Sequence, residues 1–118
     1  MGKLRRGIAE EYLYKNKLQK SGNFVFRVAG SLSPADLIVV TKDKVKFIQV
    51  KSTKKKCYYF SRFDIEEWKN LKKLKEWNPN IEIEFVIIFK RGMGKKPRIV
   101  ILRPSVDELP KKVEIPKD

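Results

Sequence analysis

The hydrophobic and polar positions predict two helices. The first is expected over residues 7–20, and Ser21-Gly22-Asn23 follows it as a frequent helix stop. The second is expected to begin at Ser61 or Arg62 and to end near Trp77. Its apolar residues recur every three positions and are expected to face the core: Ile65, Trp68, Leu71, Leu74 and Trp77.

The rest of the pattern predicts five strands, at Asn23–Ala29, Asp36–Thr41, Val45–Ser52, Ile81–Lys90 and Arg98–Leu102. Short turns join the first three, which predicts an antiparallel meander. The fourth contains a continuous apolar run, typical of a strand covered on both faces. The order α-β-β-β-α-β-β indicates an α/β fold with a central mixed five-stranded sheet and flanking helices.

The length of 118 residues suits one domain, with a basic arm at residues 1–7. Residues 104–118 form a proline-containing tail, expected to follow the surface or to be partly loose.

The charge balance indicates a polyanionic partner. Lysine and arginine number 28 against 14 acidic residues, a formal net charge of +14. Such a field attracts nucleic acid or an anionic membrane. Because no apolar run could span a bilayer, we expect nucleic acid and no membrane association.

The cysteine and histidine counts narrow the chemistry. The single cysteine, Cys57, cannot form an internal disulfide, so an intracellular, cytoplasmic location is expected. The absence of histidine excludes histidine zinc sites and Ser–His triads. Any metal must then be held by oxygen atoms, which favours Mg²⁺ or Mn²⁺.

A small set of polar side chains interrupts the apolar pattern and forms a candidate site for a cation and a charged reactant. Asp36 begins one apolar run, and Gln49 and Lys51 share one face of the next because side chains alternate along a strand. In the first helix, Glu11 is expected in the middle of the apolar face and Glu10 toward its edge. Two interpretations remain open: the set holds a cation and a charged reactant, or polar residues simply end two strands and Glu11 is solvated.

Several motifs in order resemble a known family. They are Arg5-Arg6-Gly7, Ala9-x-Glu11, Arg27–Ser31, Ala35–Ile38 and Gln49–Lys55, the last followed by an aromatic strand and a helix. This set resembles the archaeal Holliday junction resolvases of the PD-(D/E)xK nuclease superfamily, from about residue 3 to residue 90. The resemblance implies a restriction-endonuclease-like fold, Mg²⁺-dependent cleavage of four-way DNA junctions and a homodimer.

The resemblance also implies residue roles. Glu11, Asp36 and the residue at position 49 would hold Mg²⁺ or Mn²⁺, and Lys51 would orient the attacking water or stabilise charge at the phosphate. Ser31 and Arg27 would lie beside the scissile strand. The family has a glutamate at position 49, whereas this chain has Gln49, whose amide oxygen can bind a metal but brings no charge.

Three functions follow as alternatives: a junction resolvase, a catalytically weak or inactive protein that binds branched nucleic acid, and a nuclease of linear DNA. Trp68, Trp77 and Phe89 are candidates for a dimer interface. Contacts with DNA phosphates are expected from seven basic residues: Lys3, Arg5, Arg6, Arg27, Lys54, Lys55 and Lys56.

Overall fold

The computed structural model describes residues 8–28, 35–103 and 108–117. Both helices and all five predicted strands are present, each within about two residues of its predicted range, and a short aromatic strand follows the lysine run. A last strand, absent from the predicted order, lies in the tail. The elements are α1 (Ile8–Lys20), β1 (Phe24–Arg27), β2 (Leu37–Val40), β3 (Val45–Thr53), β4 (Cys57–Tyr59), α2 (Arg62–Trp77), β5 (Ile81–Phe89), β6 (Arg98–Leu102) and β7 (Lys112–Glu114).

Five strands form a mixed sheet in the order β1-β2-β3-β5-β6, which confirms the predicted fold class. The first three strands pair antiparallel, as the short turns predicted, and β6 pairs antiparallel with β5. β3 and β5 run parallel over nine residue pairs. A parallel pair needs a long connection, and α2 provides it.

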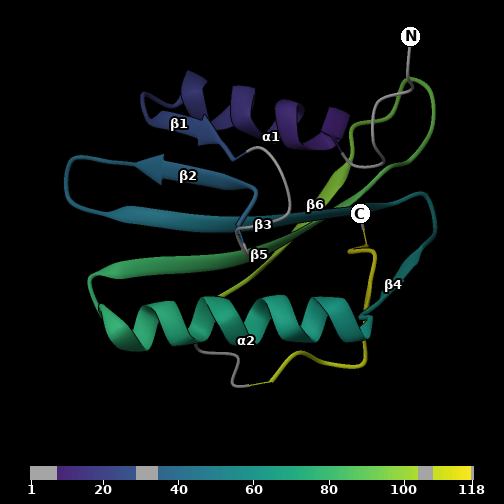
Figure 1. The fold of residues 1–118 in the computed structure, drawn as a ribbon. Coiled ribbons are helices and arrows are strands. Elements are labelled where there is room, and N and C mark those ends of the chain that lie inside the picture. Colours follow the sequence, from purple (N-terminus) through teal and green to yellow (C-terminus); the bar gives the residue numbers. More distant parts are fainter. Residues whose placement is uncertain (1–7, 29–34, 104–107, 118) are drawn as a thin grey trace, which may run out of the picture.

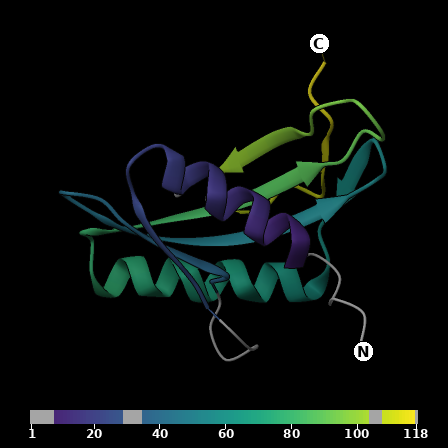
Figure 2. The same cartoon turned by 90° about the horizontal axis from the view of Figure 1, so that it is seen from above.

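The sheet separates two hydrophobic clusters. Figure 1 shows α1 on one face of the sheet and α2 along the other, and in Figure 2 the two helices run obliquely to each other. Val86 and Ile88 of β5 belong to the cluster beneath α1, whereas Phe85 and Ile87 belong to the cluster beneath α2. The apolar run of β5 is therefore covered on both faces, as predicted.

Gly22 ends α1. Its φ of +89° lies in the left-handed region that glycine tolerates, and its N–H donates to the Gln19 carbonyl at 3.0 Å.

Ser61 and Asp64 begin α2 by capping it reciprocally. Ser61 Oγ accepts from the Asp64 N–H at 3.2 Å, and Asp64 Oδ2 accepts from the Ser61 N–H at 2.8 Å. These bonds satisfy two backbone donors that a helix start leaves open.

The prediction that the whole apolar stripe of α2 faces the core is wrong at both ends. Trp68 and Leu71 are buried, but Ile65 is 41% exposed and Trp77 is 80% exposed. The physical reason is the spacing, since a repeat of three residues falls short of the 3.6-residue turn and the stripe winds away from the sheet. Trp68 and Phe89 are also excluded as surface residues for a dimer interface, because both are buried in the α2 cluster.

The tail contributes a strand instead of a loose end. β7 pairs antiparallel with β4 in a second, two-stranded sheet, and Val113 lies opposite Tyr58. Val113 and Ile115 pack on the α2 cluster, so the tail covers the core next to the end of β3. No described helix is long and apolar enough to cross a membrane.

Replacing Ile87 by alanine tests this arrangement. Ile87 is fully buried in the middle of β5, so Ile87→Ala should lower the free energy of unfolding by about 2–5 kcal/mol. The matched variant Ile65→Ala, at an exposed position of α2, should change it by less than about 0.5 kcal/mol. Urea denaturation of both variants measures the difference, and equal losses would contradict the assignment of the core.

Candidate functional site

Asp36 lies immediately before β2 and is fixed by its backbone and its side chain. Its N–H donates to the Ile48 carbonyl and its carbonyl accepts from the Val28 N–H, both at 2.8 Å. Asp36 Oδ2 accepts from the Val50 N–H at 2.9 Å. Burial raises the pKa of the Asp36 carboxyl above its ordinary value despite this hydrogen bond, and the negative charge of Glu11 adds to the rise. The carboxylate is thus held in a place where a positive charge would stabilise it.

Gln49 lies opposite Asp36 on the neighbouring strand. The pairing of Leu37 with Ile48 is the last of the β2–β3 register, and the next pair in the same register is Asp36 with Gln49. Residues opposite each other point to the same face of a sheet, here the α2 face with Lys51. Gln49 is 3% exposed, and its Oε1 has no hydrogen-bond partner among the described residues. An unpaired buried acceptor costs about 1–3 kcal/mol, so this oxygen is suited to a bound ligand.

Lys51 is held by two carboxylates of α2. Its Nζ lies 3.0 Å from Glu67 Oε1 and 3.5 Å from Asp64 Oδ1. Burial by itself lowers the pKa of the ammonium, but the hydrogen bond and charge of Glu67 and the charge of Asp64 outweigh it and hold the pKa of Lys51 above its ordinary value. Lys51 is therefore a permanent cation on the face that carries Gln49.

Glu11 reaches toward Asp36 from α1. Its Oε1 accepts a hydrogen bond from Arg27 Nε at 3.0 Å, and both side chains are largely buried. Burial is the main cause of the raised pKa of the Asp36 carboxyl, and the negative charge of Glu11 adds to it. Arg27 also lies over the Tyr12 ring, 5.1 Å from the centroid. Glu11 is thus paired with Arg27 and interacts with Asp36 through its charge.

The prediction that Glu11 is central on the buried face of α1 and Glu10 peripheral needs correction. The side chain of Glu10 is 10% exposed and that of Glu11 is 13% exposed, so Glu10 is the buried one and Glu11 is partly buried. Glu10 forms an ion pair with Lys90, whose N–H in turn donates to the Thr53 carbonyl at 2.9 Å. This partner, supplied by the chain just after β5, offsets the burial of Glu10 and lowers its pKa below the ordinary value.

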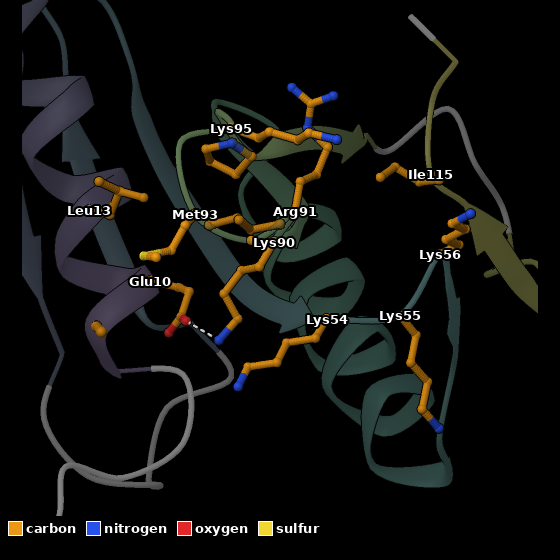
Figure 3. Close-up of a pocket in the computed structure, with 14 residues that line it drawn as sticks. Glu10, Leu13, Lys54, Lys55, Lys56, Lys90, Arg91, Met93, Lys95 and Ile115 are labelled. Atoms are coloured by element: carbon orange, nitrogen blue, oxygen red, sulfur yellow. Dashed lines mark hydrogen bonds and ion pairs between the residues drawn. The ribbon is translucent and has the colours of Figure 1, made fainter.

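A hollow of about 1050 Å³, here called the basic hollow, opens beside this ion pair. Figure 3 shows Glu10 and Lys90 joined at its centre, with lysines from the β3–β4 loop on one side. Glu10 is the only carboxylate among the described residues that line it. Its basic side chains are Lys54, Lys55, Lys56, Lys90, Arg91 and Lys95.

The basic hollow brings the lysine run after β3 together with the β5–β6 loop, whereas Lys3, Arg5, Arg6 and Ser31 lie outside the described residues. Apolar side chains also line the hollow, among them Leu13, Ile88 and Met93. This surface can accept phosphates at its rim.

The residues around Asp36 include oxygen donors of the kind that a hard divalent cation prefers. Among the described residues, no group of three or more histidine, cysteine, aspartate or glutamate side chains is arranged to hold a metal. The available set is mixed: carboxylates of Asp36 and Glu11 and the unpaired Oε1 of Gln49. Such oxygen donors suit Mg²⁺, which keeps several of its waters and takes one or two carboxylates from a protein.

A solved structure shares this architecture. It is Hjc, a Holliday junction resolvase from the archaeal hyperthermophile Archaeoglobus fulgidus, with a TM-score of 0.67 and 20% sequence identity. The match covers 92% of this chain and 84% of that one. The chain shares the fold of that resolvase. No family model matches the sequence, and no curated protein matches it.

Asp64 and Glu67 are absent from the candidates that the sequence suggests. Asp64 could have been found from its place three residues after Ser61, where a helix-capping side chain is expected. Its further contact, with Tyr58 Oη at 2.8 Å, carries no sequence signal. Glu67 lies one turn beyond Asp64, and only the crossing of α2 over β3 brings it to Lys51.

Carboxyl titration by NMR tests whether Glu11 and Asp36 share one site. Glu11→Gln removes the negative charge that raises the pKa of Asp36, so the pKa of Asp36 should fall. Glu10→Gln, one residue earlier in α1, should leave the pKa of Asp36 in place because Glu10 pairs with Lys90 instead. Equal effects of the two variants would contradict the site.

Proposed function

We propose that this protein is a metal-dependent endonuclease that hydrolyses DNA phosphodiester bonds at four-way junctions. One observation carries the proposal: two side chains that can supply oxygen ligands lie opposite each other where the pairing of β2 with β3 ends. They are the Asp36 carboxylate, held by the Val50 amide, and Gln49, whose buried Oε1 has no partner among the described residues. The fold shared with Hjc, itself a Holliday junction resolvase, supports the substrate class.

The proposed site residues divide the chemistry of hydrolysis. Asp36, Glu11 and Gln49 would hold Mg²⁺ or Mn²⁺, which would supply charge neutralisation at the phosphate and a more acidic water. Lys51 supplies a fixed positive charge on the same face, where negative charge develops on the phosphate. Arg27 orients Glu11 through their hydrogen bond. Ser31 is proposed to lie beside the scissile strand.

The basic hollow is the proposed surface for the DNA backbone. Three of its lysines, Lys54 to Lys56, follow β3 directly and come a few residues after Lys51 in the chain, so the same DNA strand would pass from these lysines toward the proposed metal site. Lysine contacts of this kind bind phosphates without reading sequence, as recognition of a branched shape requires. Lys3, Arg5 and Arg6 are proposed to extend the same contact.

A homodimer is part of the proposal. A four-way junction presents two symmetry-related strands, and a two-fold dimer would place one site on each. Exposed aromatic side chains are available for such an interface on β1 and α2: Phe24, Phe26, Phe63 and Trp77.

A second candidate function, binding of branched DNA without cleavage, is favoured by the ion pairs of Lys51 and the missing charge at Gln49. Both carboxylate partners of Lys51 come from α2 and hold it by ion pairs, and Gln49 brings no charge to the metal. A protein with this site could bind branched DNA without cutting it.

Cleavage of a labelled four-way junction with Mg²⁺, and then with Mn²⁺, separates the two functions. The proposal predicts cutting of the junction in preference to a linear duplex of the same sequence. Asp36→Asn and Lys51→Ala should each lower the rate by roughly 10²-fold or more and leave junction affinity nearly unchanged. Asp43→Asn, in the exposed β2–β3 turn, is the matched control and should cut normally. Tight binding without cutting at any metal concentration would favour the second function.

Salt-dependent binding tests the basic hollow. The triple variant Lys54→Ala/Lys55→Ala/Lys56→Ala should bind the junction more weakly, and its salt slope should fall by about 0.9 for each lost phosphate contact. The control removes three exposed lysines elsewhere, Lys20, Lys69 and Lys73, and should keep most of the slope. Fluorescence anisotropy at several salt concentrations measures both. A larger change in the control variant would place the DNA on another surface.

A further inference from the structure

We propose that Glu67 of α2 is a positioning residue for the candidate metal site, acting through bound water and Lys51, and that it supplies the negative charge that Gln49 does not. The candidate metal site denotes Asp36, Glu11 and Gln49. This inference rests on the proposed function, because the metal it serves is the one proposed there.

Glu67 lies on the same face of the sheet as Gln49 and Lys51. Gln49 and Lys51 point from β3 toward α2, and Glu67 Oε1 lies 3.0 Å from Lys51 Nζ. The side chain of Glu67 is 27% exposed, whereas that of its neighbour Glu66 is 64% exposed. α2 therefore turns one of two adjacent glutamates into the site and leaves the other in solvent.

Asp64 is less suited to this role, because one of its two carboxylate oxygens already accepts two hydrogen bonds. Oδ2 accepts from Tyr58 Oη and from the Ser61 N–H, both at 2.8 Å, and these bonds cap α2. Within the described part of the chain, Glu67 has Lys51 as its hydrogen-bonding partner and carries no such structural duty. Glu67 is thus the carboxylate that can respond to a cation.

The local charge favours a further cation in a protein that is otherwise strongly basic. Counting only residues that the structure describes, four carboxylates face two cations here, which gives two negative charges in excess where the chain as a whole carries +14. The groups are Glu11, Asp36, Asp64, Glu67, Arg27 and Lys51.

The unpaired Oε1 of Gln49 is the independent observation that directs this charge toward a ligand. A cluster of acids could be balanced by its own lysine and arginine, but the side-chain oxygen of Gln49, which is 3% exposed and has no partner among the described residues, calls for a donor or a cation. It lies opposite Asp36, on the face that Glu67 approaches.

Glu67 would act through water and through Lys51 instead of binding the metal directly. The described carboxylates do not converge as a three-ligand cluster, and Mg²⁺ retains waters that an outer carboxylate can hold. Its charge would also fix Lys51 Nζ beside the site. Glu67 is in this sense a positioning residue.

Mn²⁺ binding to the full chain, measured by calorimetry without DNA, tests the role. Glu67→Gln should weaken Mn²⁺ affinity by roughly ten- to a hundredfold, the effect typical of an outer carboxylate. Glu66→Gln, the neighbouring residue of α2, should leave it unchanged. Thermal melting of both metal-free variants controls for the fold.

A second carboxylate introduced nearby tests whether Glu67 contributes its charge to metal binding or only stabilises α2. Gln49→Glu introduces a carboxylate on β3, so the double variant Gln49→Glu/Glu67→Gln should recover most of the lost Mn²⁺ affinity. The gain in affinity from Gln49→Glu should be smaller in the wild-type background than in the Glu67→Gln background. Unchanged Mn²⁺ affinity in Glu67→Gln, with wild-type binding intact, would overturn this inference alone. Absence of Mn²⁺ binding in the wild type would overturn it together with the proposed function.

Discussion

The hydrogen bond from the Val50 amide to Asp36 Oδ2 is the contact on which the candidate site depends. It joins the start of β2 to the middle of β3, and the backbone bonds of Asp36 to Val28 and Ile48 prevent the residue from shifting along the ladder. A change of register by one residue would turn Asp36 away from Gln49. The position of the carboxylate is therefore set by the hydrogen bonds of the sheet itself.

Two opposite electrostatic requirements are met within a short distance along β3. The strand carries Gln49 and Lys51 into a region with excess negative charge, and three residues later the chain enters the basic hollow. A nuclease needs both, since a cation is held by carboxylates and a phosphate backbone is held by lysines. The ion pair of Glu10 with Lys90 lies inside the basic hollow and attaches α1 to the end of β5.

The sequence predicted the sheet, both helices and the β3 face because these follow from periodicity. Strand alternation alone placed Gln49 and Lys51 together, and the apolar run of β5 was recognisable as a strand covered on both faces. The site residues that lie on the helices were harder to predict from the sequence. The contact of Glu67 with Lys51 depends on the angle at which α2 crosses the sheet, and the burial of Glu10 depends on Lys90, eighty positions away. Contacts between distant elements leave no local pattern.

The central claim is that Asp36 and Gln49 hold a divalent cation. A crystal soaked in Mn²⁺ tests it most directly, by the anomalous signal of the metal. The account predicts a peak between the Asp36 carboxylate and Gln49 Oε1, with Glu67 within reach of a bound water. No peak there, with the Gln49 oxygen still unpaired, would contradict it.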